Sequence, residues 1–85
     1  MGQKEKLIER FHAFPKDFSF EELVRLLSFL DFQLYQRGRT SGSRVVFIHK
    51  ESGIKIILHK PHGRTTLLDY QMKQVAACLK QEGLL

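Results

Sequence analysis

The residues of this 85-residue chain best suited to chemistry are histidines and arginines that lie close together in the sequence. His49, His59 and His62 are three of its four histidines, and Arg44 precedes them. Histidine acts as a general base or acid because its unperturbed pKa, about 6.5, lies near neutral pH. Arginine keeps its charge, and its planar fork of donors matches a phosphate. This combination is typical of proton transfer beside a bound anion.

All four residues fall in a basic stretch, residues 38–64. The stretch holds six Lys and Arg residues against one acid, Glu51, which gives a net charge of +5. Arg37 directly precedes it. The whole chain also carries +5, so the remaining residues sum to zero. The positive charge is therefore local, and it predicts an anionic partner, either nucleic acid or an acidic protein.

The composition is typical of one small globular domain. Hydrophobic residues make up 42% of the chain and charged residues 27%. No apolar run approaches the ~18 residues of a membrane span, and the N-terminus lacks the apolar segment of a secretory signal. The single cysteine, Cys78, has no partner for an internal disulfide. We therefore expect a cytoplasmic protein that is not inserted in a membrane.

The elements that must position these side chains follow from hydrophobic periodicity. Helical spacing predicts three helices, over residues 4–14, 20–30 and from between 66 and 70 to 82. Alternation predicts three strands, over residues 32–37, 44–50 and 54–59, with a turn at 51–53. Ser19 and Glu22 form a capping-box pattern before the second helix. The fold class is therefore α+β, a three-stranded antiparallel sheet with helices on one face, in the order α-α-β-β-β-α.

Strand alternation also separates the two faces of this sheet, a core face covered by the helices and an open face without helices. In the last strand it puts Ile56 and Leu58 on the core face and His59 on the open face. Tyr35 is expected on the open face as well, where an aromatic ring can stack on an unpaired base. Phe47 is expected in the core.

A set of short motifs is similar to those of the HicA toxin family. In chain order they are Gly42-Ser43 before the second strand, His49 at its end, Pro61-His62-Gly63 before the last helix, and the ending Lys80-Gln81-Glu82-Gly83-Leu84. The similarity covers residues 19–85, which leaves residues 1–18 as an N-terminal helical extension. It implies a fold like the double-stranded-RNA-binding domain. It also implies a metal-independent ribonuclease that acts on messenger RNA (an mRNA interferase) and is neutralised by a HicB-type antitoxin.

On this resemblance, His59, His62 and Arg44 are the catalytic candidates. The RNA-binding candidates are Arg37, Arg39, Ser43, Arg44, Lys50, Lys60, Arg64 and Tyr35. One position departs from the family, because its catalytic histidine usually follows Gly-Ser directly and Arg44 stands there. Arginine binds phosphate but is a poor proton shuttle. The alternatives are therefore a non-catalytic RNA-binding or antitoxin-binding domain on the same fold, or a module that binds only an acidic protein.

Other interpretations of the same residues are simpler. Each basic residue taken alone is consistent with a solvated surface charge. Each histidine taken alone is consistent with an exposed or locally hydrogen-bonded side chain. The spacing His59-x-x-His62 suggests zinc, but Cys78 is far away on a helix, so we expect no metal and no cofactor. Cys78 lies beside an apolar stripe and is expected in the core. The free chain is expected to be a monomer.

Overall fold

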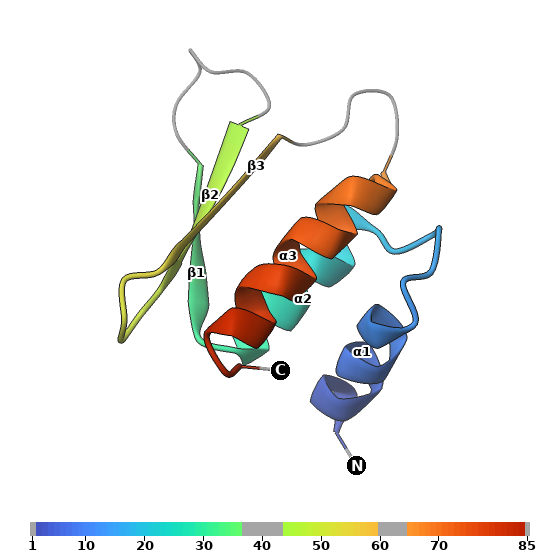
Figure 1. Cartoon of the computed structure of the whole chain (residues 1–85), viewed down its shortest axis with the longest axis horizontal. Helices are drawn as coiled ribbons and strands as arrows, with labels where there is room; N and C mark the ends of the chain where they lie inside the picture. Colours follow the sequence, from blue (N-terminus) through green and yellow to red (C-terminus); the bar gives the residue numbers. More distant parts are fainter. Residues whose placement is uncertain (1, 37–43, 60–64, 85) are drawn as a thin grey trace.

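The computed structural model describes residues 2–36, 44–59 and 65–84. Its elements are α1 (Gln3–His12), α2 (Phe20–Phe29), β1 (Phe32–Gln36), β2 (Arg44–His49), β3 (Lys55–His59) and α3 (Asp69–Gln81). The strands form one antiparallel sheet in the order β1-β2-β3. Helices α2 and α3 cover one face of this sheet, and α1 packs on their far side (Figure 1). The expected α+β class and element order are confirmed. No helix in the described ranges is long and apolar enough to cross a membrane.

Helix α2 begins where the capping pattern predicts. The hydroxyl of Ser19 accepts the backbone N–H of Glu22 at 3.0 Å, and the Glu22 carboxylate accepts the backbone N–H of Ser19 at 2.9 Å. These two bonds satisfy two of the donors that a helix start leaves free. The apolar residues that recur at spacings of three, four and three along this segment are all buried, namely Phe20, Leu23, Leu27 and Leu30.

Helix α1 ends earlier than the periodicity predicts, at His12 rather than residue 14. The reason is Pro15, whose ring disfavours helical geometry at the residue before it. Phe14 consequently adopts a left-handed backbone with φ 49°. The chain turns back there, and Phe18 packs edge-on against Phe11 with ring centroids 5.5 Å apart. Phe11 and Phe18 are both fully buried, so α1 contributes directly to the core.

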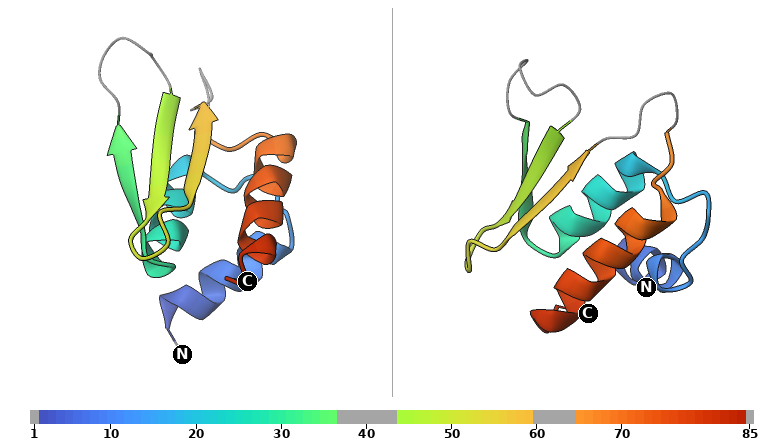
Figure 2. Two further views of the ribbon diagram at one scale, coloured as in Figure 1. Left: turned by 60° about the vertical axis from the view of Figure 1, so that its left-hand side comes forward. Right: turned by 45° about the horizontal axis from the view of Figure 1, so that its top comes forward.

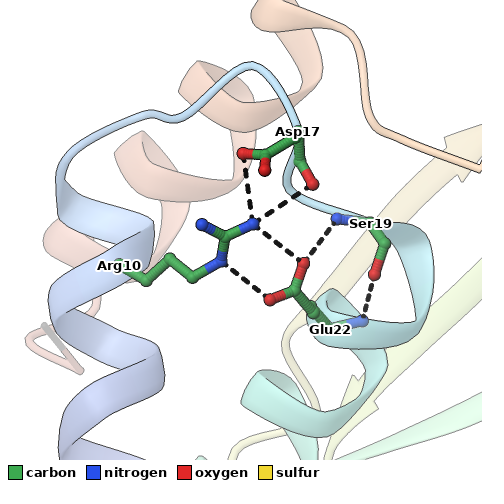
Figure 3. A network of polar contacts seen from close by, with 4 residues as sticks. All are labelled: Arg10, Asp17, Ser19 and Glu22. Carbon is green, nitrogen blue, oxygen red and sulfur yellow. Dashed lines mark hydrogen bonds and ion pairs between the residues drawn. The ribbon is translucent and has the colours of Figure 1, made fainter.

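A polar network also joins α1 to the start of α2 (Figure 3). The Arg10 guanidinium donates to both carboxylate oxygens of Glu22, at 2.8 and 3.3 Å, and contacts the Asp17 carboxylate at 3.2 Å. The hydrogen bond from Arg10 lowers the pKa of Glu22, and the backbone N–H of Ser19 lowers it further. Glu22 therefore serves both as a helix cap and as the ion-pair partner of the neighbouring helix.

This network predicts a pH-dependent stability. Because the pKa of Glu22 is lower in the folded chain, the ion pair stabilises the fold above the ordinary pKa of 4.5, and this contribution disappears as the pH falls through the folded value. Glu22→Gln keeps a capping side chain but removes the charge. We expect it to lower the melting temperature near neutral pH by roughly 1–5 °C. It should also weaken the decline in melting temperature between about pH 6 and pH 3.

Thermal melts followed by circular dichroism test this expectation. Glu21→Gln is the matched control, because Glu21 lies in the same helical turn but is exposed. An identical pH dependence in Glu22→Gln and the wild type would contradict the assignment.

The core lies between the sheet and the helices. Its strand members are Phe32, Val45, Phe47, Ile56 and Leu58, and α3 contributes Met72, Val75, Ala76 and Leu79. The expected alternation is confirmed, because Ile56 and Leu58 are buried whereas Lys55, Ile57 and His59 are exposed. Gly83, at φ 72°, ends α3 in the left-handed geometry that glycine favours.

Candidate functional site

The face of the sheet turned away from the helices is uncovered in the described part of the chain (Figure 2). The pairing register places its side chains in rows across the strands. One row is Tyr35, Val46 and Ile57, of which Tyr35 is 45% exposed and Ile57 40%. The next row contains Arg44 and His59. Both rows lie on the open face of the sheet.

Arg44 and His59 are direct cross-strand partners. Side chains opposite one another in an antiparallel pair have Cβ atoms about 5 Å apart, so a cation and an imidazole project side by side. Both residues are exposed, and within the described residues neither side chain has a hydrogen-bond or ion-pair partner. The backbone beneath them is held in place, because the Gln71 side-chain amide donates to the His59 carbonyl at 2.7 Å. The pair can bind an anion and exchange a proton.

The neighbouring row supplies a largely apolar surface. Tyr35 lies opposite Val46, which lies opposite Ile57, so this row crosses all three strands. The Tyr35 hydroxyl donates to the Gln33 side-chain oxygen at 3.4 Å on the same face. Aromatic rings on an uncovered sheet are a common platform for unpaired bases. A base on this row would bring its phosphate towards Arg44.

The structure brings only some of the predicted residues together. Arg44, His59 and Tyr35 share the open face. Lys50 directly follows β2 at the opposite end from Arg44, roughly 20 Å away for an extended strand of this length. The remaining predicted residues, namely Arg37, Arg39, Ser43, Lys60, His62 and Arg64, lie outside the described residues.

His49 is on the other side of the sheet, in contrast to His59. It is buried, and its ring packs edge-on against Phe32 with centroids 5.0 Å apart. Its Nδ1 accepts the backbone N–H of Ser52 at 3.2 Å and lies 3.0 Å from the Ser52 hydroxyl. His49 therefore stabilises the β2–β3 turn and does not contribute to the open face.

Two further features bear on metal binding and nucleophilic chemistry. Burial raises the pKa of the Cys78 thiol, which packs against the core, so its reactive thiolate form is disfavoured. Within residues 2–36, 44–59 and 65–84, no group of three or more His, Cys, Asp or Glu side chains is placed to hold a metal ion. His62 of the His59-x-x-His62 pattern lies outside those ranges.

The sequence pattern did not single out two glutamines that support the site. Gln71 is 2% exposed, and Gln74 donates to the Ile57 carbonyl at 3.3 Å. Both therefore join α3 to the backbone of β3. A glutamine on a helix usually indicates a solvated face, so helical periodicity alone carried no signal for this contact.

Comparison with known families identifies the chain. The model of a family described as HicA toxin of bacterial toxin-antitoxin matches residues 20–84. This chain belongs to the HicA toxin family. The match runs from the first residue of α2 to the end of the described chain, so it includes the sheet, the open face and α3, and it leaves α1 outside. Neither a curated protein nor a solved structure matches the chain.

Membership in the HicA family makes this chain the toxin component of a toxin–antitoxin system. The expected resemblance is thereby confirmed. The position after Gly42-Ser43, which we expected to hold a histidine in this family, is the arginine that begins β2, Arg44. In this HicA chain, the histidine nearest to that arginine across the sheet is its cross-strand partner, His59.

Proposed function

We propose that this HicA-family toxin is a metal-independent ribonuclease that cleaves messenger RNA in the cytoplasm and is neutralised by a HicB-type antitoxin. The observation that supports the proposal is the pairing of Arg44 with His59 on the uncovered face of the sheet. The adjacent row of Tyr35, Val46 and Ile57 adds a surface for an unpaired base. A histidine suited to proton transfer, a permanently charged arginine and a surface for base stacking are thus adjacent on the sheet.

The proposed chemistry uses the neighbouring 2′-hydroxyl of the RNA as nucleophile. A base takes the 2′ proton as the oxygen bonds to phosphorus, and an acid gives a proton to the departing 5′ oxygen. Arg44 stabilises the charge that develops on the phosphate oxygens. His59 takes one of the two proton-transfer roles and His62 the other. The products are a 2′,3′-cyclic phosphate and a free 5′-hydroxyl.

Phosphate contacts hold the RNA in register in this proposal. Besides Arg44, the residues assigned to them are Arg37, Arg39, Ser43, Lys50, Lys60 and Arg64. Contacts to phosphates position a nucleic acid without reading its sequence. Tyr35 is assigned to base stacking, which tolerates all four bases.

A second candidate function is an RNA-binding or antitoxin-binding domain that does not cleave. It is favoured by Arg44 at the usual histidine position and by the burial of His49, because His59 is then the one histidine on the open face among the described residues. In this case Arg44 binds a phosphate without any proton transfer.

Incubation of the purified protein with end-labelled single-stranded RNA, with and without EDTA, separates the two candidates. Cleavage that persists in EDTA supports the metal-independent ribonuclease. RNA that is bound but intact supports the non-cleaving domain. RNA that is neither bound nor cut contradicts both RNA functions, and the basic stretch then serves a protein partner.

Arg44→Ala is expected to weaken RNA binding and reduce its salt dependence. Each phosphate neutralised on a single strand releases counterions, so losing one contact should make the slope of log affinity against log salt shallower by about 0.7. Fluorescence anisotropy over a salt series measures this slope. Arg25→Ala is the matched control, because Arg25 is exposed on α2, on the helical side of the sheet. Equal slopes for Arg44→Ala and the wild type would remove Arg44 from the RNA interface.

A further inference from the structure

The two edges of the sheet differ in how their backbone groups are satisfied. The Lys50 N–H donates to the Asp31 carbonyl at 2.9 Å, in line with the β1–β2 register. Asp31 and Lys50 therefore form a hydrogen-bonded pair. Hydrogen-bonded and non-hydrogen-bonded pairs alternate along an antiparallel ladder, so Gln33 and Tyr35 bond to β2, whereas Phe32 and Leu34 do not. The N–H and C=O groups of Phe32 and Leu34 therefore point away from the sheet. Among the described residues, no side chain bonds to these outward groups.

At the opposite edge, α3 satisfies two outward carbonyl groups of β3. The Ile57 and His59 carbonyls point outward there, and they accept the side-chain amides of Gln74 at 3.3 Å and Gln71 at 2.7 Å. Helix α3 runs beside β3, whereas β1 is at the outer margin of the sheet (Figure 2). Within residues 2–36, 44–59 and 65–84, the β3 edge is thus partly protected by α3, and nothing covers the β1 edge.

Strand β1 also lacks the features that normally prevent an edge from pairing. Its sequence, Phe32–Gln36, contains no charged residue and no proline. Its register with β2 runs through all five residues without a bulge. Natural proteins protect exposed edges with charges, prolines or bulges, so an edge with none of them within the strand is suited to receive another strand.

A groove runs beside this edge, between β1 and α2. Its volume is about 220 Å³, and it is lined by Val24, Ser28, Phe32, Gln33, Leu34, Phe47 and Lys50. Small-molecule sites usually measure about 300–1,000 Å³, so this groove fits one or two side chains better than a free ligand. A groove between an edge strand and a helix is the kind of site to which an extended peptide adds. Lys50 is the one charged residue among the described residues of its lining, which favours an acidic side chain in the occupant.

We propose that the edge of β1 binds an extended segment of the antitoxin as an additional strand. An apolar side chain of that segment enters the groove between Val24 and Leu34, and an acidic one lies beside Lys50. The inference rests on the assignment to a toxin–antitoxin system and not on RNA cleavage. A second copy of this chain fits less well, because β1 has no acidic residue to offer Lys50. RNA cannot supply the alternating N–H and C=O groups that a strand edge requires.

The test uses the full-length chain and its purified cognate antitoxin, titrated by calorimetry. Ser28→Trp fills the groove from an exposed position on α2. We expect it to weaken binding by roughly tenfold or more. Ala77→Trp is the matched control on the exposed surface of α3, beside the protected edge, and should stay within about twofold of the wild type. In the wild-type complex, the Phe32 and Leu34 amides should become protected from hydrogen exchange.

The possible results separate this inference from the proposed ribonuclease. Wild-type affinity in Ser28→Trp, or Phe32 and Leu34 amides that exchange equally fast in the complex, would overturn it. If Ser28→Trp does not fold, the hydrogen exchange of the Phe32 and Leu34 amides in the wild-type complex decides between these outcomes. A wild-type chain that does not bind the antitoxin would also overturn it. The same holds if the free chain forms a homodimer that dissociates in Ser28→Trp. RNA cleavage is measured separately, so an inactive ribonuclease that still pairs through β1 leaves the inference standing.

Discussion

Alanine at position 59 is expected to lower the rate of RNA cleavage by about a hundredfold or more, with a much smaller effect on RNA affinity. The reason is that the proposed mechanism assigns proton transfer to His59, which the β2–β3 register places opposite Arg44. Arg44 keeps its charge in this variant, so the phosphate contact that the proposal assigns to it should remain. The loss should therefore appear in the chemical step, which single-turnover cleavage of end-labelled RNA in EDTA measures directly.

His12→Ala is the matched control for this experiment. His12 is also an exposed histidine, but it ends α1, on the far side of α2 and α3 from the sheet (Figure 1). We expect its cleavage rate to equal that of the wild type. His62→Ala should resemble His59→Ala if the two histidines share the proton-transfer roles. Unimpaired cleavage in His59→Ala would show that the Arg44–His59 pair is not the catalytic centre.

Phe11→Ala is expected to reduce the free energy of unfolding by about 3–5 kcal/mol. This is a large part of the roughly 5–15 kcal/mol that stabilises a typical domain. Phe11 is 0% exposed, and its ring centroid lies 5.5 Å from that of Phe18 and 6.1 Å from that of Phe14. Its removal leaves a cavity where α1 packs against the rest of the core. Urea unfolding at neutral pH measures the loss.

The control for Phe11→Ala is Phe29→Ala, since Phe29 is 37% exposed at the end of α2. We expect it to cost less than half as much, because more than a third of the residue is already exposed to water. Phe11 lies outside the family match at residues 20–84, and Phe29 lies inside it. A large effect at Phe11 would mean that α1 and the family-matched residues 20–84 unfold as one unit. A negligible effect would mean that α1 is dispensable for folding.

Local sequence features were sufficient for most of the secondary structure. The capping box of Ser19 and Glu22 and the apolar stripe of α2 act within a few residues, so the start and buried face of that helix were predictable. Alternation likewise predicted which face of β3 is buried, because successive side chains point to opposite sides of a strand. The end of α1 was predicted two residues too late, because the periodicity continued to Phe14 while Pro15 prevented helical geometry there.

The candidate site depended on interactions between segments that are distant in the sequence. By itself the sequence determined the element order, the position of the basic stretch and the alternation that puts His59 on the open face. Only the tertiary structure decided that Arg44 pairs with His59 and that His49 is enclosed with Phe32 and Ser52. It also decided that α3 contacts the edge of β3, whereas no described residue covers the edge of β1. The physical reason is that alternation specifies the face of a strand but not its partner. The pairing register and the docking of a helix against an edge are set by packing across the whole domain.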